Sequence, residues 1–162
     1  MMHWSGWVGA AVVLSIVLVA CRREPLAEPQ DPIYEGGTAA LMRVLQGANS
    51  GVDCQELVVC RDSATFAELW ARHGRLQMPA PSMPELDFDH FYAVCLFGGS
   101  RPSGGYSVTI EGLEPTKDGV RVLAHEEEPE PGSAQITMMT APFEIVAVPQ
   151  FEGTAELVWT GN

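Results

Sequence analysis

Hydrophobic and polar residues alternate along much of the second half of the chain, and this pattern predicts strands. Tyr106, Val108 and Ile110 alternate with polar residues, which is the period of a strand with one buried face. Residues 91–97 form a nearly continuous apolar run and predict a buried central strand. We expect strands at residues 38–46, 55–61, 91–97, 105–111, 120–125, 135–140, 143–148 and 154–159. For residues 38–46, a short helix is the alternative.

One amphipathic helix is expected between the second and third of these strands. It begins at a cap, Asp62 or Ser63, and Gly74 is placed to end it. Its apolar face carries residues at i, i+3, i+4 and i+7, namely Phe66, Leu69, Trp70 and His73. The expected fold class is therefore α+β and mostly β, with this helix packed on an antiparallel sheet.

The first twenty residues have the pattern of a bacterial lipoprotein signal peptide. Residues 8–20 are apolar but short for a helix that spans a membrane. The run ends in Leu18-Val19-Ala20-Cys21, which resembles the lipobox, where a cysteine is acylated and becomes the first residue. We therefore expect a signal peptide at residues 1–20 and lipid attachment at Cys21, with several acyl chains as a stable anchor.

Residues 22–37 contain three prolines among acidic residues and no apolar period. Residues 21–37 are thus expected to form an extended, lipid-attached tether, followed by a β-rich domain at residues 38–162. An uncleaved anchor is the alternative, because no Lys or Arg precedes the apolar run and Arg22 and Arg23 follow it. By resemblance to lipoprotein sorting, Arg22 favours the outer membrane of a bacterial envelope, facing the periplasm or the cell surface.

Composition restricts the class of partner. The chain has 162 residues, of which 46% are hydrophobic, so it can form one packed domain after a targeting segment. Its formal net charge is −12. An acidic surface argues against binding to nucleic acid and against electrostatic attraction to anionic lipid.

Residues 99–106, with the sequence Gly-Ser-Arg-Pro-Ser-Gly-Gly-Tyr, connect two of the expected strands. The simplest interpretation is a tight turn, since proline fixes its own φ and glycine accepts positive φ. A second interpretation is a binding feature, in which an arginine and unshielded backbone N–H groups hold a carboxylate or a partner's main chain. The residues of this partner-binding hypothesis are Arg101, Ser103, Gly104, Gly105 and Tyr106.

The run Arg101-Pro102-Ser103-Gly104-Gly105-Tyr106-Ser107-Val108 resembles the signature of the protease-complex subunit PrcB family, in its C-terminal domain. Thr140-Ala141-Pro142-Phe143 and residues 145–149 resemble that family's turn and following strand, and residues 66–70 and 87–88 resemble elements that often precede the signature. The resemblance covers the chain from about Thr38 onward. It implies a small exported domain, in one described setting an accessory subunit of a surface protease, and it implies no catalytic residues.

Three cysteines remain once Cys21 is assigned to lipid, an odd number for an oxidising compartment. Cys54 could pair with Cys60, or Cys60 with Cys95, and either bridge leaves one thiol free. No Cys-x-x-Cys motif is present, so a redox enzyme is not expected.

Other candidate chemistry lacks a diagnostic pattern. Potential metal ligands occur at Asp87, Asp89, His90, His125 and residues 126–128. Ser103 is followed by two glycines and does not lie in a Gly-x-Ser-x-Gly elbow. No phosphate loop or dinucleotide fingerprint is present. We therefore assign no catalytic residue, no metal and no cofactor.

The sequence thus predicts a non-enzymatic, lipid-anchored envelope protein whose domain binds a partner protein. A secreted or surface protease is the partner that the PrcB resemblance implies. Two alternatives remain: an envelope hydrolase that uses Ser103 or a histidine and acid site, and a structural envelope lipoprotein.

Overall fold

A computed structural model describes residues 41–161 of the chain. The predicted signal peptide, the lipid attachment site Cys21 and the tether lie outside the described residues. Within residues 41–161, no helix is both long enough and apolar enough to cross a membrane.

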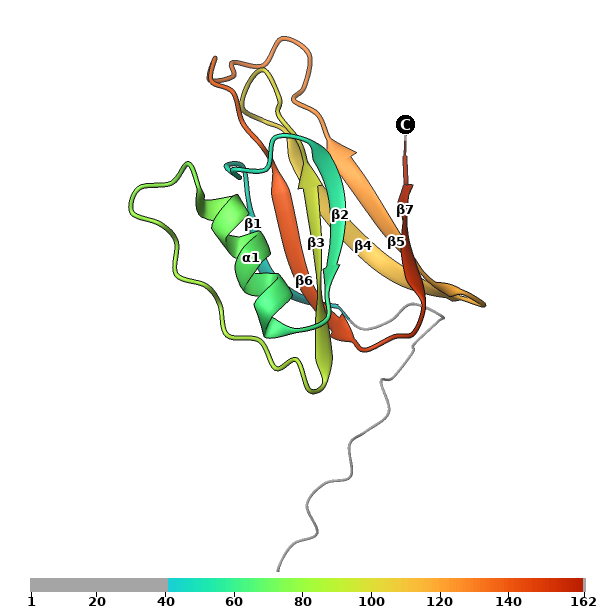
Figure 1. Ribbon diagram of the computed structural model, residues 1–162. Coiled ribbons are helices and arrows are strands. Elements are labelled where there is room, and N and C mark those ends of the chain that lie inside the picture. The colour runs from blue at the N-terminus through green and yellow to red at the C-terminus, as the bar shows by residue number, and fades with distance from the viewer. Residues whose placement is uncertain (1–40, 162) are drawn as a thin grey trace, which may run out of the picture. The chain divides into compact units, whose positions relative to one another are not determined.

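The described residues form seven strands and one helix (Figure 1). In chain order they are β1 (Met42–Gly47), β2 (Gln55–Cys60), α1 (Ser63–Gly74), β3 (Phe91–Gly98), β4 (Ser107–Thr116), β5 (Gly119–Glu127), β6 (Phe143–Pro149) and β7 (Thr154–Trp159). The strands form a four-stranded sheet of order β1-β6-β3-β2 and a three-stranded sheet of order β4-β5-β7. The first sheet is antiparallel throughout, whereas β7 runs parallel to β5.

The elements are arranged in three layers. Helix α1 covers one face of the four-stranded sheet, and the three-stranded sheet lies against its other face (Figure 1). Along β3, Ala93, Cys95 and Phe97 face the helix, while Val94 and Leu96 face the second sheet. Both faces of this antiparallel strand are therefore buried, which explains the continuous apolar run that the sequence shows.

The helix forms where the sequence places it. Asp62 is the N-cap, and its carboxylate accepts a hydrogen bond from the Thr65 backbone N–H at 2.8 Å. This bond and the hydroxyl of Thr65 hold the pKa of Asp62 below its usual value. The four residues of the predicted apolar face, Phe66, Leu69, Trp70 and His73, are all buried. The helix ends at Gly74, with Arg75 as C-cap in a right-handed conformation.

The predicted fold class is confirmed: the domain is mostly β, with an antiparallel sheet and a single helix. One predicted strand is wrong. Residues 135–140 form no regular strand, and their single ladder contact is an isolated bridge between Thr140 and Arg101. Residues 131–139 are all exposed, so no neighbouring strand lies along them and the local strand preference has nothing to pair with.

Candidate partner-binding surface

The turn between β3 and β4 begins and ends at glycines with positive φ. Gly99 has φ of 77° and Gly105 has φ of 89°, a region that residues with a Cβ rarely adopt. Between them, the Arg101 N–H donates to the Thr140 carbonyl at 2.7 Å and the Thr140 N–H donates back at 3.0 Å. The turn is therefore joined to the segment that leads into β6.

The Arg101 side chain is engaged inside the chain. Its guanidinium lies 2.6 Å from the Glu126 carboxylate of β5 and 5.8 Å from the centroid of the Tyr106 ring. The Arg101 and Glu126 side chains are 21% and 23% exposed. The Arg101 guanidinium, which the sequence suggested as a donor to a partner, thus already has a carboxylate and an aromatic ring as neighbours within the chain.

The remaining residues of the binding hypothesis also make contacts within the chain. The Ser103 hydroxyl donates to the Gly104 carbonyl at 3.1 Å, and the Thr140 hydroxyl donates to the Ser103 carbonyl at 2.7 Å. The Gly104 N–H donates to the Ile136 carbonyl at 3.0 Å. Gly105 is exposed. The structure therefore brings the predicted residues together, as a turn braced against residues 136–140.

Beside this turn lies a groove of about 690 Å³. One wall is formed by residues 75–78 after the helix and the other by residues 138–141, with Asn49, Ser50 and Ser100 also lining it. We call this feature the loop groove. Leu76 and Met78 on one wall are 73% and 96% exposed, and Met138 and Met139 on the other are 53% and 69% exposed.

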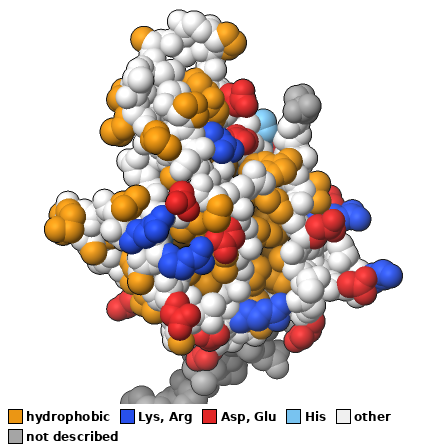
Figure 2. All heavy atoms as spheres, turned by 45° about the horizontal axis from the view of Figure 1, so that its top comes forward, with side chains coloured by type: hydrophobic (Ala, Val, Ile, Leu, Met, Phe, Trp, Pro, Cys, Tyr) orange, Lys and Arg blue, Asp and Glu red, His pale blue; other side chains and the backbone are white. Residues whose placement is uncertain are grey.

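Exposed apolar side chains are concentrated in these two loops. Six of the seven exposed large hydrophobic residues among residues 41–161 lie in the loop after α1 or the loop before β6, and four of the six line the groove. The six are Leu76, Met78, Met83, Ile136, Met138 and Met139. Figure 2 shows hydrophobic side chains gathered on the projecting upper part of the domain and at a tip on its left side. This surface is not apparent from the sequence, because its residues fall in loops, and periodicity does not indicate which loops are neighbours in space.

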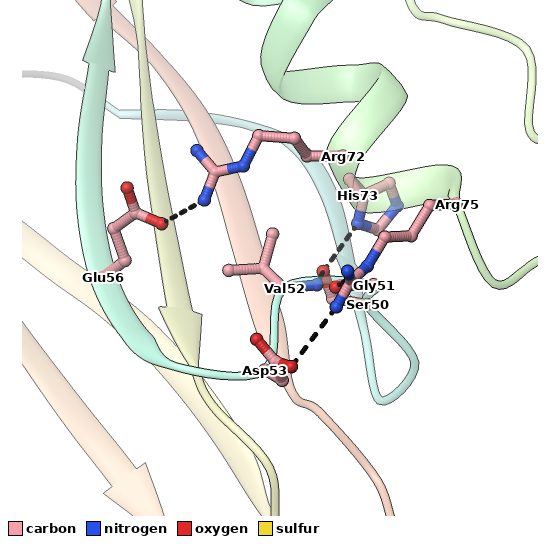
Figure 3. A network of polar contacts seen from close by, with 8 residues as sticks. All are labelled: Ser50, Gly51, Val52, Asp53, Glu56, Arg72, His73 and Arg75. Atoms are coloured by element: carbon pink, nitrogen blue, oxygen red, sulfur yellow. Dashed lines mark hydrogen bonds and ion pairs between the residues drawn. The ribbon is translucent and has the colours of Figure 1, made fainter.

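A set of polar contacts holds the loop after β1 against the end of the helix (Figure 3). Arg75 donates to the Gly51 carbonyl at 2.6 Å and lies 3.3 Å from the Asp53 carboxylate. The Gly51 N–H donates to the His73 carbonyl at 2.7 Å. Next to them, Arg72 pairs with Glu56 of β2 at 2.7 Å. These contacts fix the base of the loop groove on the helix side.

His73 is the buried histidine of this network. Its Nδ1 lies 3.1 Å from the Ser50 hydroxyl, and its ring packs against Trp70 and Phe143 with centroids 4.9 and 4.3 Å away. Because burial penalises the charged imidazolium, the pKa of His73 is lowered. The Ser50 hydroxyl also accepts the Val52 N–H at 3.0 Å, so this serine and histidine brace a turn.

Ser50 and His73 do not have the arrangement of a hydrolase active site. The second ring nitrogen of His73 has an amide for a neighbour, since Nε2 lies 3.5 Å from Gln77 Nε2. A serine nucleophile needs a histidine base that a third, usually acidic, group orients. The hydroxyl of Ser103, the serine considered from sequence, donates to the Gly104 backbone carbonyl instead.

The cysteines and the candidate metal ligands are also placed by the structure. Cys60 and Cys95 are buried in β2 and β3, Cys54 is exposed, and all three are free thiols. A hydrogen bond between the two buried thiols lowers the pKa of Cys60 and raises that of Cys95. His90 lies 2.7 Å from Asp87, which lowers the pKa of that carboxyl. Among residues 41–161, no three His, Cys, Asp or Glu side chains form a group that could hold a metal ion.

Together, these observations define a small β-rich domain whose turn and neighbouring loops present apolar side chains. Residues 92–149 match the family model described as PrcB C-terminal, so this stretch of the chain is similar to that domain. The match confirms the resemblance seen in sequence and includes the Arg101 turn and residues 135–140. The family is one of subunits associated with a protease complex.

Searches of the curated proteins and of the solved structures found no match.

Proposed function

We propose that this protein is a non-enzymatic, lipid-anchored envelope protein whose PrcB C-terminal domain binds a partner protein. The partner that fits the family is a secreted or surface protease, with this chain as its accessory subunit. The lipid at Cys21 would hold the domain at a membrane, and the proline-containing tether would hold it away from the bilayer surface. An outer membrane position, facing the periplasm or the cell surface, is part of the same proposal.

The main support for this proposal is the loop groove. Leu76 and Met78 together with Met138 and Met139 expose apolar surface on both sides of one depression. Exposed apolar patches of this kind mark interaction sites in soluble domains, because leaving such side chains in water is unfavourable. The Arg101 turn adjoins the groove through Ser100 and Thr140.

Co-purification from the protein's own cells tests this proposal. The tagged, full-length protein should recover one partner in fixed stoichiometry, and Leu76→Ser should reduce that recovery without changing the melting temperature. Met83→Ser is the matched control, because Met83 is 44% exposed but does not line the groove. Equal recovery by both variants would contradict the proposed surface.

Two further measurements separate the proposal from its alternatives. Cys21→Ser should abolish lipid labelling and cleavage of the signal peptide, and a mature chain that begins elsewhere would contradict the anchor. Turnover of an ester or peptide substrate by the purified protein, if lost in Ser103→Ala, would instead establish the hydrolase. A protein that neither recovers a partner nor turns over substrate would fit the structural lipoprotein.

A further inference from the structure

Residues 135–139 have the composition of a strand, but among residues 41–161 no strand of either sheet pairs with them. Ile136, Met138 and Met139 are 72%, 53% and 69% exposed. Within the described part of the chain, the N–H groups of Gln135, Thr137 and Met139 donate to no protein group. Exposed segments with free backbone groups and apolar side chains are templates for pairing with another chain.

Within residues 41–161, no strand fills the position beside this segment that continues the line of β1. β1 ends at Gly47, and Asn49 still forms a parallel bridge with Ala141. The chain then turns away through Gly51, whose N–H bonds to the helix end. A strand that continued β1 beyond Asn49 would run alongside Met138 and Met139. This position coincides with the loop groove, because Asn49, Met138 and Met139 all line it.

Charge at this end of the domain indicates the occupant. Arg75 and Arg101 are both already paired, with Asp53 at 3.3 Å and Glu126 at 2.6 Å. Three further acidic residues follow Glu126 along the chain, and all are exposed. Glu127 is the last residue of β5, and Glu128 and Glu130 lie in the loop that leads to residues 135–139. None of these three forms an ion pair among the described residues. A segment with basic side chains complements this excess of negative charge.

We propose that the loop groove receives an extended segment of a partner protein that has alternating apolar and basic side chains. The segment pairs through its main chain with residues 135–139 and places apolar side chains between Leu76 and Met139. Methionine suits this role, because its flexible thioether adapts to different side chains. The inference rests on the proposed function and specifies how the partner is bound.

Synthetic peptides test the binding mode on the full-length protein, purified with its lipid in detergent. The probe is a fluorescent ten-residue peptide of alternating lysine and valine. Two controls have the same length: one carries glutamate in place of lysine, and one is N-methylated along a single edge. We expect saturable binding of the basic peptide, at least tenfold weaker binding of the acidic one, and loss of binding on N-methylation.

Variants locate the site. Leu76→Ser and Met139→Ser should each weaken binding of the basic peptide about five- to tenfold, and the matched control Met83→Ser should leave it unchanged. Glu130→Lys should weaken binding more than Glu68→Lys, which makes the same charge change on the exposed side of α1. Bound peptide should also slow amide hydrogen exchange in residues 135–139.

Several outcomes would overturn the inference: no saturable binding, equal binding of the N-methylated peptide, equal binding of the acidic peptide, or equal losses in Met83→Ser and Met139→Ser. Failure here can be told apart from failure of the proposed function. If the peptides fail while the tagged protein still recovers a stoichiometric partner, the partner-binding function stands and the strand-pairing mode does not.

Discussion

The carboxylate of Glu144, in β6, accepts a hydrogen bond from the backbone N–H of Ile110, in β4 of the opposite sheet. Glu144 is fully buried, and its second partner is the Arg43 guanidinium of β1. The Ile110 N–H is next to a bulge, because the register of β4 shifts between Ile110 and Gly112. A buried charge thus joins the two sheets where a strand ladder is interrupted.

Replacement of Glu144 by alanine should be destabilising. The change leaves the buried Ile110 N–H without its acceptor, whereas Arg43, whose side chain is 56% exposed, remains solvated. We therefore expect a loss of about 1–3 kcal/mol in the free energy of unfolding. Urea denaturation measures this loss. The matched control is Glu56→Ala, which breaks the exposed pair with Arg72 and should cost less than about 1 kcal/mol. Equal losses would mean that Glu144 is not a link between the sheets.

Trp70 should contribute strongly to stability, because it lies on the buried face of α1. The side chain is 7% exposed, its ring lies 5.9 Å from that of Phe66, and its Nε1–H donates to the Pro81 carbonyl at 2.9 Å. Trp70→Ala should therefore cost about 3–5 kcal/mol. Trp70→Phe keeps an aromatic ring but loses the bond to Pro81, and should cost about 1–2 kcal/mol. A melting temperature for Trp70→Ala within a degree or two of the parent would show that the helix is peripheral.

The helix and most strands could be predicted from sequence, because periodicity reports which side of an element is buried. Phe66, Leu69, Trp70 and His73 are an example, since their spacing alone placed them on one buried face. Division of the strands into two sheets could not be predicted, because a period of two does not state which strands are neighbours. The parallel pairing of β5 with β7 arises because the intervening β6 belongs to the other sheet.

The candidate site was predictable in part. The Arg101 turn was found because proline and glycine mark turns locally, and its glycines do take positive φ at Gly99 and Gly105. The contact between Arg101 and Glu126 depends on the register of β4 and β5, which local sequence does not specify. Residues 135–140 were predicted as a strand because their composition fits one, but the strands described between residues 41 and 161 all pair elsewhere.

His73 should make the stability of the domain depend on pH in a defined window. Its pKa is lowered in the folded state by burial, whereas a histidine in the unfolded chain has a pKa of about 6.5. The unfolded state therefore binds more protons below that value, and the free energy of unfolding falls as pH drops through 6.5 towards the folded pKa. Above about pH 7.5 this contribution is fully present.

Urea denaturation at pH 7.5 and pH 5.0 measures the effect. The wild-type domain should be less stable at pH 5.0, and His73→Gln should lose most of that difference. The exposed His90 provides a matched control, and His90→Gln should show the same difference in stability between the two pH values as the wild-type domain. Asp62 and Asp87 have lowered pKa values, so their contributions are lost mainly below about pH 4, outside this window. An unchanged pH dependence in His73→Gln would show that the buried imidazole is not responsible.

Gly105 and Gly104 are adjacent but should respond differently to a side chain. Gly105 has φ of 89°, and a Cβ there would lie 2.6 Å from Gln135 Oε1 and 2.8 Å from Pro129 Cβ. Gly104 does not have a positive φ, and the atoms nearest to a Cβ there would be 3.9 Å away. We therefore expect Gly105→Val to impair folding and Gly104→Ala to be tolerated.

Arg101→Ala distinguishes a partner-binding role of this turn from a structural one. The variant leaves the backbone bridge to Thr140 intact but removes the pair with Glu126, so we expect a loss of about 1 kcal/mol in stability. If Arg101 also contacts the partner near the centre of the interface, co-purification should weaken by at least ~1 kcal/mol beyond that loss. The control is Glu126→Gln, which breaks the same ion pair and leaves the guanidinium in place. Equal partner recovery by both variants, in proportion to the folded protein present, would show that the arginine acts within the fold alone.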